Sequence, residues 1–315
     1  MSTDTIREKL IGGALPGERA PKFYSLELLR FICAFSIVWG HLGAPHAIVA
    51  YAGLDTFIIL SVALSTRAAT RQDFATFMMR RVIRIFVPWV IWSGFYLFFR
   101  GLRDGWHTMF QLTDPAWLLI GPEIHLWFLP FILISAPFAY IAMHLPHGRV
   151  FGAIMVVVTL PLSCGLYYVE WNAMLSPPWT QWCFALPPLF YAVIRVSGRR
   201  WGPSFLLVGT LIGMTLLGHP EPAWFLILSA VLFEVFLHFD KIGRWAGPLG
   251  DAAFGIYVLH PFFIVVIAHF ISLTGHTIFF AELVFLASWA GSYALLRIGQ
   301  ALTANFAAAR TSTEP

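Results

Sequence analysis

The chain has 315 residues, of which 58% are hydrophobic and only 11% are charged. This composition excludes an ordinary soluble domain, in which about 25% of residues are charged, and its apolar runs approach the roughly 20 residues that a membrane-spanning helix needs. The net charge of +4 then reflects orientation in a bilayer rather than nucleic-acid binding. We expect an all-α, polytopic transmembrane helical bundle, with the lipid bilayer and not nucleic acid as its partner.

The chain is expected to have one membrane domain between two tails. The segment through Pro21 carries both charge signs and lacks the apolar core of a signal peptide. We expect a cytoplasmic N-terminal tail over 1–25, a transmembrane domain over 26–300 and a cytoplasmic C-terminal tail over 301–315. Hydropathy predicts about ten spans, at 26–46, 47–66, 82–100, 124–143, 150–168, 180–197, 203–218, 223–240, 251–271 and 277–299.

Lys and Arg residues gather at one end of these spans. Nearly all of them fall in the tails, or in the connections on the N-terminal side, and only Arg100 and Arg103 lie opposite. Positive charge marks cytoplasmic loops. The pattern therefore predicts that both termini face the cytoplasm, N-in and C-in.

The first expected span contains two ionisable residues, Arg30 and His41. On a helix they lie about 20° apart around the axis and roughly 16 Å apart along it, so one stripe carries both. Ionisable groups inside a membrane helix are costly and usually functional. The alternatives are that Arg30 extends to the membrane surface and that His41 is a hydrogen-bonded core residue. In the second span, Asp55 is expected to face the bundle interior, where it orients His41, pairs with Arg30 or forms a structural ion pair.

The next connection reads RAATRQDFATFMMRRVIRIFVPW and carries Arg80, Arg81 and Arg84. Residues 72–79 fit an amphipathic helix along the membrane surface, and the spacing of Arg81 and Arg84 places two guanidiniums side by side on a helix. Arginine forks match phosphate oxygens well. The cluster is therefore either an anion site or a set of positive-inside anchors.

Further polar residues accompany the fourth and ninth spans. Glu123 and His125 open the fourth span among aromatic residues, a combination that suits a sugar through ring stacking and hydrogen bonds. An interfacial aromatic belt explains the aromatics equally well. His260 precedes Pro261 in the ninth span; it either reaches the same interior as His41 or satisfies a backbone group freed by the proline. No His, Cys or carboxylate set has metal-ligand spacing, so we expect no metal.

Five segments, in order along the chain, resemble the acyltransferase-3 family of membrane proteins, which O-acylate bacterial glycans. They are the Arg30 and His41 pair after LELL, GLDTFIILSVAL at 53–64, RRVIRIFVPW at 80–89, HLWFLP at 125–130 and FGIYVLHPFF at 254–263. Val62 and Ile58 depart from the family pattern, which leaves the subfamily open.

The resemblance implies a multi-pass enzyme of the bacterial cytoplasmic (inner) membrane. It implies acyl-CoA, usually acetyl-CoA, as a donor substrate rather than a tightly bound cofactor, with Arg80, Arg81 and Arg84 at its nucleotide end. The acceptor would be a carbohydrate such as an exopolysaccharide, an O-antigen or a lipid-linked glycan. His41 is the expected general base or transient acyl carrier, and Arg30 its catalytic companion. Asp55, Glu123, His125 and His260 are expected substrate contacts. The alternative function is a transporter or flippase for a glycan, because polar groups inside a bundle also mark substrate paths.

Overall fold

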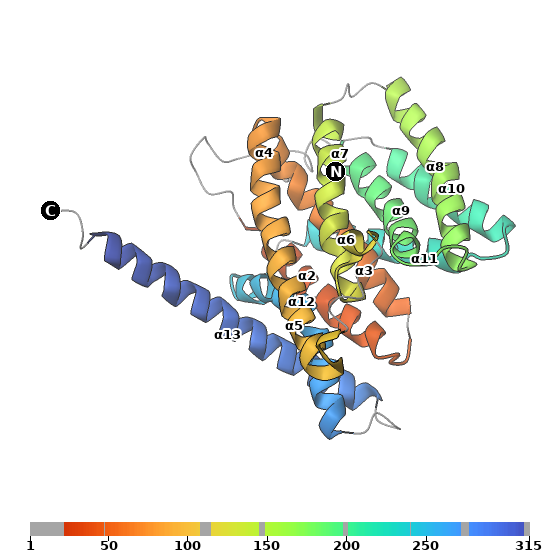
Figure 1. Cartoon of the computed structure of the whole chain (residues 1–315). Coiled ribbons are helices and arrows are strands. Elements are labelled where there is room, and N and C mark those ends of the chain that lie inside the picture. The colour runs from red at the N-terminus through yellow and green to blue at the C-terminus, as the bar shows by residue number, and fades with distance from the viewer. Residues whose placement is uncertain are drawn as a thin grey trace. The chain divides into compact units, whose positions relative to one another are not determined.

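A computed structural model describes residues 22–46, 48–107, 115–144, 149–197, 201–239, 241–271 and 277–311. Within these ranges every helix or strand assignment is helical, as expected from the composition, and Figure 1 labels the helices in chain order. Residues 1–21 of the expected N-terminal tail lie outside the described ranges. At the other end, α13 runs from Thr277 to Thr311 and so continues into the expected C-terminal tail.

Each of the ten expected spans coincides with a helix. The helices are α2 (Tyr24–His41), α3 (Ile48–Ala69), α5 (Val87–Asp104), α7 (Phe128–His144), α8 (Arg149–Trp171), α9 (Trp179–Val196), α10 (Gly202–Leu216), α11 (Glu221–His238), α12 (Ala246–Phe270) and α13. Six helical stretches in the described residues are long and apolar enough to cross a membrane, and they include α5, α7, α8, α11, α12 and α13. Apolar parts of α3 and α10 are shorter. The chain is therefore a helical membrane protein, while ten spans and N-in, C-in orientation stay predictions.

The chain divides into two compact units. Unit 1 contains residues 58–233, and unit 2 contains residues 22–57 together with 234–315. Unit 2 thus joins α2 and the first half of α3 to α12 and α13, so it brings the two ends of the sequence together. Arg30, His41, Asp55 and His260 belong to unit 2; the three arginines, Glu123 and His125 belong to unit 1.

In unit 2, α2 and α3 form a helical hairpin with close backbone contact. A Cβ atom added to Gly53 would lie 2.7 Å from the Cβ atom of Ser36, and one added to Gly40 would overlap the side chain of Ala50. Any side chain at these two positions would therefore force the helices apart. Small residues at helix contacts are typical of membrane bundles, because they allow dense packing between backbones.

Helix α12 lies beside α2 and runs in the same direction. Near the start of both helices, Gly247 faces Tyr24 and Gly250 faces Glu27. Farther along, His260 in the middle of α12 contacts His41 at the end of α2. Parallel packing is what the first and ninth of a series of alternating spans require. Helices α2 and α12 also share a core with α13, formed by Ala34, Val38, Ala252, Ala253, Ile256, Phe280, Val284 and Phe285.

In unit 1, the third span differs from its expected form. The segment expected as a separate surface helix is α4 (Phe74–Arg81), which Asp73 caps by accepting a hydrogen bond from the Thr76 N–H at 3.0 Å. It continues through a π-helical turn, η1 (Val82–Phe86), directly into α5. The continuous helix from Phe74 to Asp104 has 31 residues and is about 46 Å long. It is therefore longer than a hydrocarbon core of about 30 Å.

Helices α8, α9 and α10 pack together in the rest of unit 1. Gly209 of α10 lies against Leu160 of α8, and Gly213 lies one turn later against Cys164. Both contacts advance in the same chain direction, so α8 and α10 are parallel. This is the arrangement expected when α9 returns between them.

Candidate active site

Helix α2 carries both Arg30 and His41 without a break. The predicted helical spacing therefore applies, and the two residues share a stripe with His41 in the last turn. His41 therefore lies at the end of the helix, with its ring next to the carbonyl oxygen of Ile37 one turn earlier.

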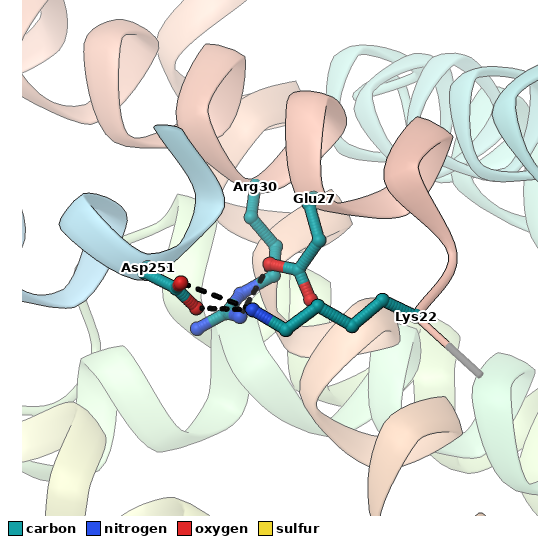
Figure 2. Close-up of polar contacts among 4 residues, drawn as sticks. All are labelled: Lys22, Glu27, Arg30 and Asp251. Carbon is teal, nitrogen blue, oxygen red and sulfur yellow. Dashed lines mark hydrogen bonds and ion pairs between the residues drawn. The ribbon is translucent and has the colours of Figure 1, made fainter. Parts of the chain in front are cut away.

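Arg30 forms an ion pair within its own helix. Its Nη1 atom donates to Oε2 of Glu27 at 2.9 Å, and the side chains are 25% and 14% exposed. Beside this pair, Lys22 donates to both carboxylate oxygens of Asp251 on α12, at 3.0 and 3.1 Å. Figure 2 shows the four side chains close together, with the Lys22 amine at the carboxylate of Asp251 and the Arg30 guanidinium at the carboxylate of Glu27. The cluster is balanced in charge, so the cost of a half-buried guanidinium is compensated locally.

Gly250 explains how this cluster is packed. A Cβ atom at Gly250 would lie 2.8 Å from the Cα atom of Glu27 and still closer to its carboxylate. Only glycine permits that approach, because real Cβ atoms do not come so near a backbone carbon. Gly250 therefore supports Glu27, and Glu27 in turn holds Arg30.

The His41 ring has a defined tautomer when it is neutral. Its Nδ1 atom lies 2.8 Å from the carbonyl oxygen of Ile37. A carbonyl oxygen only accepts hydrogen bonds, so Nδ1 carries the proton and Nε2 carries the lone pair. The side chain is exposed in the structure. This arrangement is what a general base or a nucleophile requires: a fixed ring with its basic nitrogen directed away from the helix bond.

His260 lies next to His41. The ring centroids are 4.8 Å apart, and the planes meet at 66°. His260 is completely buried, and its Nδ1 atom lies 2.7 Å from the carbonyl oxygen of Tyr257, within the turn that precedes Pro261. His260 therefore does what both alternatives described: it donates to a backbone carbonyl before Pro261, and its ring contacts His41.

Asp55 lies on the part of α3 that belongs to unit 2 and is completely buried. Its burial agrees with the expected interior position. A pair with Arg30 is one of the three alternatives given for Asp55, but the ion pair of this arginine is with Glu27. Glu27 lies three residues before Arg30 on the same helical face, so the two side chains can pair without a contact between helices. The suggested role of Asp55 in orienting His41 stays a prediction.

The three arginines do not share one regular helix. Arg80 and Arg81 end α4, whereas Arg84 lies in η1. The wider turn of a π-helix changes the angle between Arg81 and Arg84 from the one assumed for an α-helix. Arg80 and Arg84 are exposed, while the guanidinium carbon of Arg81 lies 5.2 Å from the centroid of the Phe77 ring, a cation–π distance.

Glu123 and His125 are close in sequence but differ in surroundings. Gly121, with φ of +84°, ends α6 (Trp117–Ile120) and turns the chain toward Glu123. His125 is buried in the short helix η3 (Ile124–Trp127), where its ring contacts Tyr96 at 5.0 Å between centroids. Glu123 is half-buried. Burial raises the pKa of Glu123, although the positive charges of Arg103 and Arg100 oppose the rise.

Sequence reasoning overlooked Glu27 and Gly250. The signal for Glu27 was present, since an acid three residues before Arg30 lies on the same helical face. Gly250 gave no local signal, because a glycine in an apolar helix is common in membrane proteins. Among the described residues, no three His, Cys, Asp or Glu side chains are grouped so that they could hold a metal ion.

The helical membrane fold, with a paired arginine and an oriented histidine on one helix, defines a polytopic membrane protein with a candidate group-transfer site. Residues 23–297 match the model of an acyltransferase domain. The chain belongs to the acyltransferase-3 family, as the sequence motifs indicated, and is accordingly a membrane acyltransferase. Searches of curated proteins and of solved structures gave no significant match.

Proposed function

We propose that the protein is an O-acyltransferase of the bacterial inner membrane. It moves an acyl group, with acetyl as the first candidate, from cytoplasmic acyl-CoA to a hydroxyl group of a cell-surface or lipid-linked carbohydrate. Family membership supports acyl transfer. The observation that carries the choice of His41 is that it shares one stripe of α2 with the paired guanidinium of Arg30. Its Nδ1 bond to the Ile37 carbonyl then leaves the lone pair at Nε2.

Two routes use the same nitrogen. In direct transfer, Nε2 takes the proton of the acceptor hydroxyl while the hydroxyl oxygen attacks the thioester carbon. The C–S bond then breaks, and the proton passes from Nε2 to the leaving thiolate. In the covalent route, Nε2 attacks the thioester carbon and releases the thiolate. The hydroxyl oxygen then attacks the acyl-imidazole, the C–N bond breaks, and the hydroxyl proton passes to water while the thiolate takes one up.

Arg30 is proposed to stabilise the negative charge that develops on the thioester oxygen or to contact another part of the donor. Its ion pair with Glu27 supports a fixed guanidinium rather than one that extends freely to the membrane surface. Because Glu27 engages Nη1, the other guanidinium nitrogens supply donors for a ligand.

The phosphates of acyl-CoA are proposed to bind Arg80, Arg81 and Arg84. The exposure of Arg80 and Arg84 supports this role, and the contact of Arg81 with Phe77 limits its motion. Arginine binds phosphate through paired N–H groups. The acceptor is proposed to contact Glu123 and His125, with Asp55 and His260 as the interior polar groups.

A test follows from the chemistry. Membranes containing the chain are given acetyl-CoA labelled in the acetyl group, with a glycan extract as acceptor; we expect release of free CoA and labelling of the glycan. His41→Ala should reduce both by about 10²–10⁴-fold at normal abundance, the usual contribution of general acid–base catalysis. The acetyl mass found on His41 after an acid quench would identify the covalent route.

His144 provides a matched control. It also ends a helix, is exposed and directs Nδ1 at the carbonyl oxygen four residues earlier, at 2.8 Å. His144→Ala should retain activity. Full activity of His41→Ala, or intact acetyl-CoA in membranes that contain abundant wild-type protein and acceptor, would contradict the proposal.

A further inference from the structure

The contact between His41 and His260 indicates a second residue that acts on the same reaction. We propose that His260 is a positioning residue, which holds the His41 ring so that Nε2 keeps one direction. This inference rests on the proposed function of His41 as base or acyl carrier. The geometry behind it lies entirely within unit 2.

The two rings have different surroundings. His41 is exposed, whereas His260 is completely buried. A buried ring between packed helices has few alternative rotamers, and its Nδ1 bond to the Tyr257 carbonyl at 2.7 Å fixes it further. His260 is therefore the rigid member of the pair, and His41 is the member that needs a support.

His41 has one hydrogen bond that restrains its ring. The bond from Nδ1 to the Ile37 carbonyl selects one orientation of the ring, but an exposed side chain can leave that rotamer by breaking this hydrogen bond. The edge contact with His260, at 66° between planes, adds a second point of restraint on a different side. The hydrogen bond and the ring contact together favour one orientation of the ring plane, and hence one direction of the Nε2 lone pair.

The helix contacts set this distance. Gly250 brings α12 against α2 at Glu27, and the Lys22–Asp251 ion pair joins the same ends of the helices. His260 follows Gly250 by ten residues on α12, and His41 follows Glu27 by fourteen on α2. Because both contacts join the same two helices, a change in spacing at Gly250 is expected to reach the histidine pair as well.

The reaction depends on such a restraint. Acyl transfer needs the reacting atoms aligned at roughly 3–3.5 Å, and small displacements reduce the rate steeply. A loosened His41 ring would still be present and basic but would spend less time in the reactive orientation. The effect should therefore fall on kcat, while KM for acyl-CoA stays unchanged.

Two substitutions separate ring support from other roles. His260→Ala removes the ring and should lower kcat about tenfold, whereas His260→Phe retains a flat ring and should recover most of that loss. Val284→Ala serves as the control for lost core volume, since Val284 is a buried member of the α2, α12 and α13 core; its kcat per folded molecule should match the wild type. Unchanged kcat in His260→Ala, or equal loss in the Phe and Ala variants, would overturn the proposal.

A second measurement does not depend on acyl transfer. Diethyl pyrocarbonate modifies the unprotonated imidazole nitrogen, and mass spectrometry of the full-length protein in detergent follows each histidine separately. In His260→Ala, the modification rate of His41 should rise severalfold, while that of His144, which has the same type of backbone bond, should not change. An unchanged His41 rate would refute the positioning role. If the wild type transfers no acyl group but the His41 rate still responds, the function proposal alone is wrong.

Discussion

Gly250→Ala should separate helix α12 from α2. The added Cβ atom would lie 2.8 Å from the Cα atom of Glu27, whereas carbon atoms in good contact are about 3.5–4.0 Å apart. The Cα atom of Glu27 belongs to the helix backbone and cannot relieve the clash by changing a rotamer, as the end of a flexible side chain can. The helices must therefore move apart by about 0.7–1.2 Å at this point, or Glu27 must give up its place beside Arg30.

The energetic cost can be compared with a matched variant. Overpacking of this kind costs about 1–3 kcal/mol, and alanine in place of a helical glycine returns about 0.5–1 kcal/mol. Gly299→Ala on α13 should receive the same helical benefit without the clash, because no side chain or neighbouring helix lies within 4 Å of its added Cβ atom. The difference between the two alanine variants therefore isolates the steric effect, at about 1–3 kcal/mol.

Thermal unfolding of the two purified variants at one scan rate measures that difference. Gly250→Ala should unfold at a lower temperature than Gly299→Ala, and its acyl transfer per folded molecule should fall, by as much as 10²-fold if the shift reaches about 1 Å at the reacting atoms. Equal unfolding temperatures with full activity would refute the close approach of α2 and α12. Equal unfolding temperatures with reduced activity would refute the steric estimate alone.

Three further predictions concern single charged groups. Glu27→Gln should lower activity by releasing Arg30, and Glu27→Asp should preserve part of it; a kinetic comparison in membranes checks this, and wild-type activity in the Gln variant would contradict it. Arg84→Ala should raise KM for acyl-CoA with little change in kcat, because a phosphate contact stabilises ground state and transition state alike, and the opposite pattern would remove Arg84 from the donor site. Burial raises the pKa of Glu123, so the folded protein binds the proton of this carboxyl more tightly than the unfolded protein does. The free energy of unfolding of the wild type should therefore fall as the pH rises from the unfolded pKa of about 4.3 through the raised folded pKa. Glu123→Gln should lack that decline in unfolding temperature; an identical pH profile would contradict the burial effect.

The sequence predicted the helices well because hydropathy and length act locally. All ten expected spans coincide with helices, and the Arg30 and His41 spacing survives because α2 is regular. The same local reasoning treated residues 72–79 as separate from the third span, since it could not see that η1 connects α4 to α5 without a break. The π-helical turn depends on backbone hydrogen bonds, and no residue in the segment VIRIF predicts them.

The parts of the site that escaped prediction depend on contacts between distant segments. Gly250 is recognisable as important only when Glu27 is seen against it. His260 could be suggested as a neighbour of His41 but not placed there, because the parallel packing of α2 and α12 sets the 4.8 Å between their rings. Glu27 could have been paired with Arg30 by helical spacing alone, whereas the sequence suggested Asp55, an acid from another helix, as one alternative partner.

The pairing of α2 with α12 also determines the order in which the molecule can be built. Lys22 and Asp251 are 229 residues apart in the chain, so at a synthesis rate of about 5–20 residues per second α2 waits roughly 10–45 s for its partner helix. Glu27 and Arg30 are only three residues apart and can neutralise each other during that interval. Helix α2 therefore leaves the ribosome with its own counter-ion, and Arg30 needs no distant helix to be tolerated at the membrane.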